Sequence, residues 1–570
     1  MIGLLMVAVL LTAGCANDDE ITGNGEPVSV ELAYAFPSSY FGNVTRQASE
    51  VITSETDPRP PYYMRIIPME NNDPSQAVIG WESPVEKDNP ASQFYRSRYC
   101  SLDIGVNGFR VYGNVRSLTP PVDVDTKMYN GSLIETFPSS ITEVSDVEEG
   151  ISFALEPIYK SADYSATNGI PAGAQALADC LTAIATKNSF HESTDATVKG
   201  FFDKFTNDGN HLPGSAVSVR KWIDIFISSI PEEPGELLAA VKSEAENQRN
   251  AIASLIYPRD INLPDGAAVL RWNKNTNRFE PQINTTTLDN INSIARFAYP
   301  APLYYFVASD IKTSEERVDF ATIYDEVTTN STKTAWTQVV ENPKLDKTSV
   351  SANTKAVALT KPVQFAVAQL KVNLKAYTTP LKDAKNEDVA VGTESFPLKG
   401  IVVCDQRPVD YRFEPQQVEQ GAVSDANVLF IYDNQVVSGS HLTYQSDWLD
   451  GCNTLVLQSL KNEDVNIILE FENNSGKDFT CLDGVVYQGT RFYMIGKVEA
   501  SLFNSPDPNV NSENRDQVFT KDYITTVNMT VSSLARAYNV PPNLLSPNLE
   551  IGVETTPQWE GTTPTVIRLE

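Results

Sequence analysis

The chain has 570 residues, of which 41% are hydrophobic, and it carries a formal net charge of −29. This length is enough for about two to four domains, and the hydrophobic share supports real cores. The negative charge excludes nucleic acid and anionic lipid surfaces as favourable partners, because both would repel the chain.

Residues 1–12 are almost entirely apolar, and a lone cysteine follows at position 15. The apolar run is shorter than the roughly 20 residues that span a bilayer, but it has the length of a signal-peptide core. Residues 11–15 resemble a bacterial lipobox. We therefore expect residues 1–14 to be a signal peptide and Cys15 to be lipidated, so that its acyl chains enter a membrane. Residues 15–26 are then a polar tether.

Alternating apolar residues predict the first strand at residues 27–36. Its apolar face consists of Val28, Val30, Leu32 and Tyr34. Further strands are predicted at residues 62–69 and 150–159 by the same pattern. The Asn-Gly pair between two apolar runs in residues 101–116 predicts a β-hairpin.

The apolar spacing then changes from two residues to three or four. Residues 172–187, residues 218–230 and a segment that begins at Pro234 all follow this spacing. It predicts helices with one core-facing stripe, and Pro is favoured where a helix begins. A helical insert is therefore expected at about residues 172–256.

From Gly266 the strand pattern returns as short runs separated by turn residues. Residues 522–531, for instance, alternate in the manner of a half-buried strand. The polar segment 342–353 lacks periodicity, and we place a domain boundary there. The sequence predicts a mainly β protein with two β-sandwich domains, residues 27–345 with the helical insert and residues 346–570.

No catalytic or metal-binding motif stands out. None of the three histidines has a metal-ligand neighbour at helical or hairpin spacing, and HExxH, GxSxG and phosphate-binding loops do not occur. Among 73 carboxylates no pair is marked as the acid and base of a glycosidase. Residues 507–516 alternate acidic and amide groups but lack the glycine and final glutamate of an EF-hand, so a polar turn is preferred. We expect no enzyme activity, no cofactor and no metal site.

Cysteines and tryptophans give weaker signals. Five cysteines remain when Cys15 is set aside, which leaves at least one unpaired and makes Cys452 and Cys481 candidates for a single disulfide. The tryptophans are scattered. They suit either a sandwich core or a sugar-stacking surface, and the sequence does not separate the two.

Several segments, taken in order, resemble the fimbrillins of Bacteroidetes, the lipoprotein-derived subunits of FimA/Mfa1-type pili. The order of the segments carries the resemblance, rather than any one motif. The segments are the lipobox at Cys15 and residues 27–36, 62–69, 104–116, 201–227, 363–376 and 518–559.

The resemblance implies two transthyretin-like, Greek-key β-sandwich domains in tandem and a structural, non-catalytic role. Such subunits reach the cell surface as outer-membrane lipoproteins, here held in outer-membrane lipid through Cys15. An Arg-specific protease cuts near the N-terminus and the first strand leaves. The C-terminal strand of another fimbrial subunit fills the groove by donor-strand exchange, and a host or bacterial surface ligand is a further implied partner.

Arg46 is the candidate cleavage residue, because Arg59 precedes a proline and Arg65 lies in a predicted strand. Exposed loops are generic protease sites, so an ordinary loop arginine is the competing interpretation. The candidate donor residues are Val566, Ile567 and Leu569. The alternative for this tail is that it closes the second domain's own sheet. Stalk, anchor or tip position stays open.

Two other functions compete. A glycan-binding surface lipoprotein of a nutrient-uptake system would gather Trp or Tyr side chains on one exposed face. A glycoside hydrolase would bring two carboxylates together in a cleft and raise the pKa of one by burial.

Overall fold

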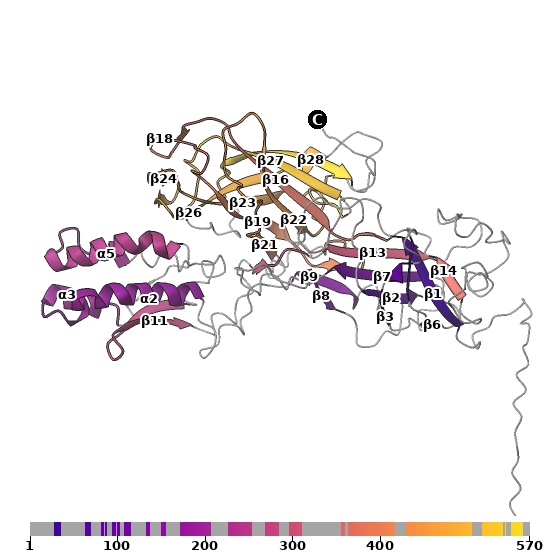
Figure 1. Cartoon of the computed structure of the whole chain (residues 1–570), viewed down its shortest axis with the longest axis horizontal. Helices are drawn as coiled ribbons and strands as arrows, with labels where there is room; N and C mark the ends of the chain where they lie inside the picture. The colour runs from indigo at the N-terminus through magenta and orange to yellow at the C-terminus, as the bar shows by residue number, and fades with distance from the viewer. Residues whose placement is uncertain are drawn as a thin grey trace, which may run out of the picture.

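The computed structural model describes residues 28–35, 63–69, 81–84, 86–87, 94–97, 100–102, 108–115, 133–136, 150–155, 172–206, 226–253, 268–283, 296–301, 303–310, 355–358, 363–416, 429–503, 516–521, 523–539, 542 and 549–561. Helices gather at one end of the molecule, a large β unit lies in the middle and a smaller β unit lies at the other end (Figure 1). Within the described residues, none of the helices combines the length and the apolar character that a membrane crossing requires.

Among the described residues, nine strands of the large β unit form one hydrogen-bonded path. In spatial order they are β12 (Arg296–Ala298), β21 (Leu429–Asp433), β19 (Leu398–Gln406), β23 (Val465–Glu472), β26 (Arg491–Val498), β28 (Val553–Gly561), β27 (Tyr523–Val531), β16 (Ala368–Ala376) and β22 (Leu449–Val456). β28 pairs with β27 along its whole length but meets β26 only at Gly496 and Val553. The path therefore divides there into two layers, in the manner of a β-sandwich.

Alternation along the strands places the core between these layers. On β27, Val527, Met529 and Val531 are fully buried, as the pattern at residues 522–531 predicts. β16 shows the same alternation of buried and half-buried residues. One continuous hydrophobic core extends from Met64 to Val553, so it includes residues of both β units.

The described strands of the smaller β unit form three sheets. The first has the order β15 (Gln364–Phe365), β13 (Leu303–Asp310), β7 (Gly108–Val115), β2 (Tyr63–Met69) and β3 (Trp81–Pro84). The second has β14 (Lys355–Ala358), β1 (Val28–Ala35), β5 (Phe94–Arg96) and β4 (Glu86–Lys87), with β6 (Cys100–Leu102) also on β1. The third has β20 (Val409–Asp410), β9 (Ser152–Leu155) and β8 (Leu133–Thr136). The strands predicted at residues 27–36, 62–69 and 150–159 are confirmed.

Several strand pairs cross the boundary expected at residues 342–353. β14 pairs with β1, and β20 pairs with β9, although β14 and β20 follow that boundary in sequence. β12 precedes it and pairs with β21 of the large unit. The backbone ladders therefore join segments from both sides of this boundary, and a common core joins the two β units.

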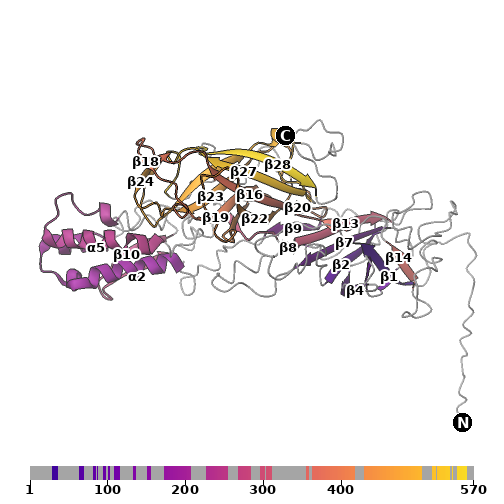
Figure 2. The same cartoon turned by 45° about the horizontal axis from the view of Figure 1, so that its top comes forward.

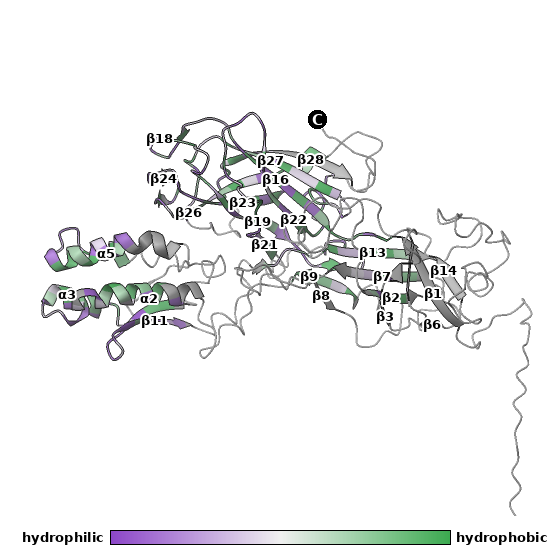
Figure 3. Cartoon of the chain, in the orientation of Figure 1, coloured by the Kyte–Doolittle hydropathy of each residue, from purple (hydrophilic) through white to green (hydrophobic). Residues whose placement is uncertain are grey.

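The helical insert has a core of its own. It contains α2 (Ala172–Thr186), the 3-10 helix η4 (Lys187–Glu192), α3 (Ala196–Asp203), α5 (Glu236–Ala253) and the hairpin of β10 (Ala268–Asn273) with β11 (Arg278–Ile283). Leu177, Leu181 and Ile184 on α2 are buried, as the spacing predicts, and α2 carries a visible hydrophobic stripe (Figure 3). None of the residues of this core belongs to the core of the β units.

The insert extends beyond the expected end at residue 256, because the β10–β11 hairpin packs on α2. The Phe279 amide donates to the Thr182 hydroxyl at 2.9 Å, and Arg278 pairs with Asp179 at 2.6 Å. Phe279 and Trp272 of the hairpin are buried in the core of the insert. Figure 2 shows the hairpin beside α2 and α5 at the end of the molecule.

Two predictions from the sequence are wrong. The hairpin expected in residues 101–116 does not form, since β6 pairs with β1 whereas β7 pairs with β13 and β2 in another sheet. Longer ladders with distant strands outcompete the local turn. The disulfide between Cys452 and Cys481 is also absent, because both are free thiols. Their sulfur atoms donate instead to the Gln435 carbonyl and to Asp483.

Candidate strand-exchange site

β1 lies between strands on both of its edges. On one edge it runs parallel to β14, with the Cα atoms of Leu32 and Val357 as partners. On the other edge it runs antiparallel to β6 near its start and to β5 near its end. Val30 is opposite Cys100 of β6, and Tyr34 is opposite Tyr95 of β5. The first strand is therefore an internal strand of its sheet.

Removal of β1 would leave its neighbours poorly paired. Among the described residues, β14 and β6 have no strand partner other than β1, and β5 keeps only the two-residue β4. Unpaired backbone donors and acceptors that are buried cost about 1–3 kcal/mol each. A vacated position of this kind is an open sheet edge, which another extended segment can fill.

The other predicted site residues lie outside the described part of the chain. Cys15 and Arg46 precede and follow β1, and their surroundings are not described. Val566, Ile567 and Leu569 come after Gly561, where β28 and the described residues end. β28 itself is paired inside the large sheet. Lipidation, cleavage and strand donation therefore stay predictions.

A loop from the large unit fills the core of the smaller one. Phe413 follows β20, has no exposed surface and stacks on Phe153 of β9, with ring centroids 4.4 Å apart. Its ring also contacts Tyr304 of β13 and Tyr112 of β7. Phe413 has a φ of 60°, a left-handed conformation that costs a non-glycine residue roughly 1 kcal/mol or more. The surrounding contacts must offset that strain.

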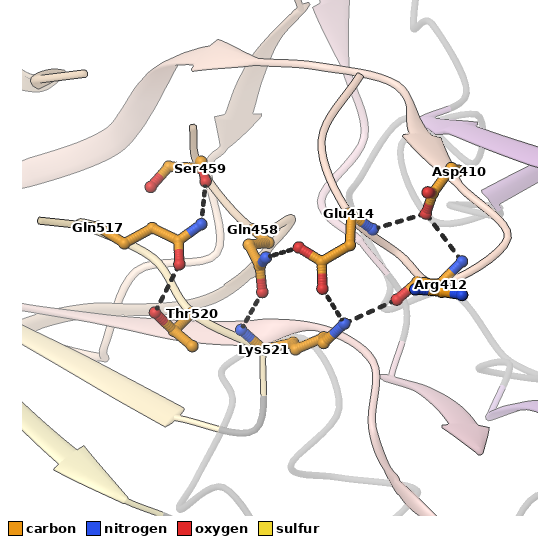
Figure 4. Close-up of polar contacts among 8 residues, drawn as sticks. All are labelled: Asp410, Arg412, Glu414, Gln458, Ser459, Gln517, Thr520 and Lys521. Atoms are coloured by element: carbon orange, nitrogen blue, oxygen red, sulfur yellow. Dashed lines mark hydrogen bonds and ion pairs between the residues drawn. The ribbon is translucent and has the colours of Figure 1, made fainter. Parts of the chain in front are cut away.

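Polar contacts hold this loop in place (Figure 4). One Asp410 carboxylate oxygen accepts the amides of Arg412 and Glu414 at 2.8 and 2.9 Å. Burial raises the pKa of Asp410. Glu414 in turn accepts from Lys521 at 2.5 Å and from the side-chain amide of Gln458. The loop is thus tied to the large unit while Phe413 sits among the strands of the smaller unit.

Among the described side chains, those that hold this junction lie outside the sheet that contains β1. Phe413 contacts strands of the two other sheets of the smaller unit, and its polar supports come from the large unit. β12 pairs with β21 in the large sheet and leads within a few residues into β13 of the smaller unit, which adds a second connection between the units. These contacts therefore tie β7, β9 and β13 to the large sandwich through residues outside β1.

The sequence did not predict that β14 pairs with β1 at this site. The apolar run at residues 356–359 marks a strand, but its position beyond the polar segment assigned it to the second domain. Its partner lies more than 300 positions earlier in the chain, and no local pattern encodes that distance. Among the described residues, no cluster of three or more His, Cys, Asp or Glu side chains is arranged to hold a metal ion.

No protein-family model matches the chain, and no curated protein matches it in sequence. Solved structures match the chain in a comparison of structures. One from Bacteroides eggerthii, described as a "putative cell adhesion protein", has 6% identity and a TM-score of 0.32, with 95% of this chain and 97% of that chain covered. The tip fimbrial protein Mfa3 of Porphyromonas gingivalis, truncated at its C-terminus, has 9% identity and a TM-score of 0.28, with 93% and 99% covered.

The fimbrilin FimA of Porphyromonas gingivalis covers less of the chain. It has 11% identity and a TM-score of 0.20, with 40% of this chain and 65% of that chain covered. The solved structures to which this chain is similar are thus described as cell adhesion and fimbrial proteins of Bacteroidetes.

Proposed function

We propose that the chain is a structural subunit of a cell-surface fimbria, exported as an outer-membrane lipoprotein through Cys15. An Arg-specific protease cuts after Arg46 and β1 leaves its sheet. A C-terminal strand from another fimbrial subunit, with Val566, Ile567 and Leu569 as candidate contacts, then enters the vacated position. The protein acts in adhesion and carries out no catalysis.

The position of β1 between β14 and the β5–β6 edge carries this proposal. The strand comes near the start of the chain, and Arg46 follows its end at Ala35 by eleven positions. A cut there separates β1 from the rest of the chain. Because the vacated position would expose backbone groups on both sides, an incoming strand gains hydrogen bonds along two edges.

The proposal is tested by limited trypsin digestion of residues 16–570. We expect a dominant cut whose product begins at Gln47, followed by filaments in electron micrographs, because the vacated edges recruit a strand from a neighbour. Arg46→Gln should remove both the cut and the filaments. Arg59→Gln is the matched control and should change neither, since a proline follows Arg59. A clean cut after Arg46 that leaves the protein monomeric contradicts the proposal.

A further inference from the structure

Exposed aromatic side chains gather at one place on the large sandwich. Among the described residues, six large hydrophobic side chains are exposed, and the three aromatic ones are Tyr377, Tyr444 and Trp448. Their exposed fractions are 69%, 54% and 37%. We call these three residues the aromatic patch. The other three exposed residues are leucines.

Backbone contacts place the patch at the C-terminal end of β16. The Ala376 amide donates to the Thr443 carbonyl at 2.6 Å, which puts Tyr377 and Tyr444 next to adjoining backbone segments. Tyr377 also continues the ladder, because its amide donates to the Val531 carbonyl at 2.9 Å. Successive residues of an extended strand alternate between faces, so Lys375 and Tyr377 share the outer face about 7 Å apart.

Lys375 fixes the third ring. Its ammonium lies 5.3 Å from the centroid of the Trp448 ring, and its Nζ atom is 3.5 Å from the Ser446 carbonyl oxygen. A cation over an indole face is attracted by the ring quadrupole, which limits the rotation of the ring. This contact favours one orientation of the Trp448 ring while part of its surface stays open. Such preorganisation lowers the entropy lost when a ligand stacks on the ring.

Polar groups surround the patch. Asp447 and Asp450 are exposed on the same segment as Trp448. Asp450 is opposite Asn373 in the β16–β22 ladder. Asn373 donates to Asn528 at 2.8 Å, whereas its Oδ1 atom has no hydrogen-bond partner within the described part of the chain. Rings, carboxylates, an ammonium and amides thus occur at neighbouring positions of the end of β16 and of residues 444–450.

We infer that the aromatic patch binds a neutral oligosaccharide. A sugar ring has an apolar C–H face that stacks on an aromatic ring and a rim of hydroxyls that need donors and acceptors. Rings with polar edges match both needs. Asp447 and Asp450 accept from hydroxyls, and Lys375 and the tyrosine hydroxyls donate. Two carboxylates against one ammonium disfavour an anionic sugar.

The size of the patch also favours a small ligand. If a fully exposed aromatic side chain offers about 200 Å², the three rings together present roughly 300–400 Å². A stable protein interface needs about 800 Å² from each partner. The patch is too small for such an interface but suits a short oligosaccharide. The β17–β18 hairpin (Leu381–Lys382 and Asp388–Val389), which follows β16, lies on the side of the large β unit that is turned away from β1 and β14 (Figure 1).

This inference adds a ligand class to the proposed function and does not require cleavage or polymerisation. The full chain, purified in a zwitterionic detergent that carries no sugar, is applied to an array of neutral gluco-, manno-, galacto- and xylo-oligosaccharides. The oligosaccharide retained most strongly is then titrated by calorimetry. We expect Trp448→Ala and Tyr444→Ala each to weaken binding by about tenfold, the usual size of one lost stacking contact.

Three matched variants control for effects other than the loss of a stacking ring. Leu502→Ala removes an equally exposed apolar side chain outside the patch and should bind normally. Trp448→Phe keeps a ring and should retain most of the affinity. Arg46→Gln should bind as tightly as the parent, which separates this inference from the assembly proposal. The inference is overturned if the array retains no neutral oligosaccharide, or if Trp448→Ala and Tyr444→Ala bind as tightly as Leu502→Ala.

Discussion

Glu470 is a carboxylate with no exposed surface in the middle of β23. Its oxygens accept from the Tyr432 hydroxyl at 2.7 Å, the Tyr493 hydroxyl at 2.8 Å and the Arg491 guanidinium at 2.9 Å. Burial by itself raises the pKa of Glu470, but Arg491 and the two hydroxyls outweigh it and bring the pKa below its ordinary value. The ionised group is therefore buried on the face of the β19–β23–β26 sheet that carries Tyr432 and Tyr493.

Glu470→Gln should lower the free energy of unfolding by about 3–5 kcal/mol at neutral pH, because it leaves the largely buried Arg491 without its counter-charge. A lowered folded-state pKa contributes stability that is present above the unfolded pKa of about 4.3 and is lost as pH falls through the lower folded value. The difference between parent and variant should therefore shrink in acid. Urea unfolding at neutral pH and at about pH 3 measures both effects.

Glu472→Gln is the matched control, two positions along the same strand. Glu472 pairs with Lys399 at 3.1 Å on a more exposed part of the sheet. Such pairs contribute about 1 kcal/mol or less. Equal losses in the two variants, or a Glu470→Gln effect that persists unchanged in acid, would contradict this account of Glu470.

In the helical insert, the position of α3 is determined by residues within and next to the helix. α3 was not predicted, although its signals are local. Asp195 caps it by accepting the amides of Thr197 and Val198 at 2.8 and 3.2 Å, and burial at Val198, Phe201 and Phe202 follows helical spacing. A more careful use of the capping pattern would have found this helix.

The limits of the sequence are clearest for strand partners. Alternation marks β1, β2 and β27 as strands, because the signal lies within each segment. Alternation does not predict the pairing partner of a strand. The pairs β1–β14 and β12–β21 join segments that are more than 100 positions apart. The local hairpin expected before β7 does not form, because β6 and β7 pair with distant strands instead. The strand of the candidate site was therefore predictable, whereas its neighbours were not.

Phe226→Ala should destabilise the insert and spare the β units. Phe226 is fully buried and its ring lies near those of Phe201, Phe202, Phe205 and Phe279. Removing a buried phenylalanine ring costs about 3–5 kcal/mol. Because the two cores share no described residue, hydrogen exchange should accelerate in α2, α3, α5 and the β10–β11 hairpin but remain slow in β16 and β27. Equal acceleration in β27 would show that the insert is not an independent unit.

At the scale of the whole molecule, the two proposed activities lie on different units. β1 and its neighbours lie at one end of the molecule (Figure 1), and the aromatic patch lies on the large sandwich at the C-terminal end of β16. The Phe413 loop and the short link from β12 to β13 join the two units. A subunit built in this way can exchange a strand at one end without disturbing the surface of the large sandwich.

The displacement of β1 is the central claim, and one substitution tests it directly. Val30 of β1 is the register partner of Cys100 on β6, so Val30→Cys places two cysteines at paired positions, where the Cα separation of neighbouring strands allows a disulfide. Ser29→Cys, whose partner is Ser101, is the matched control without an opposing thiol. Filaments are counted by electron microscopy after trypsin treatment, under oxidising and reducing conditions.

We predict that oxidised Val30→Cys is cut after Arg46 but forms no filaments, because the disulfide retains β1 in its sheet. Reduction should restore filaments to the level of the parent and of Ser29→Cys. Filaments from the oxidised, cross-linked Val30→Cys protein, or none from the cleaved parent, would contradict the exchange of β1.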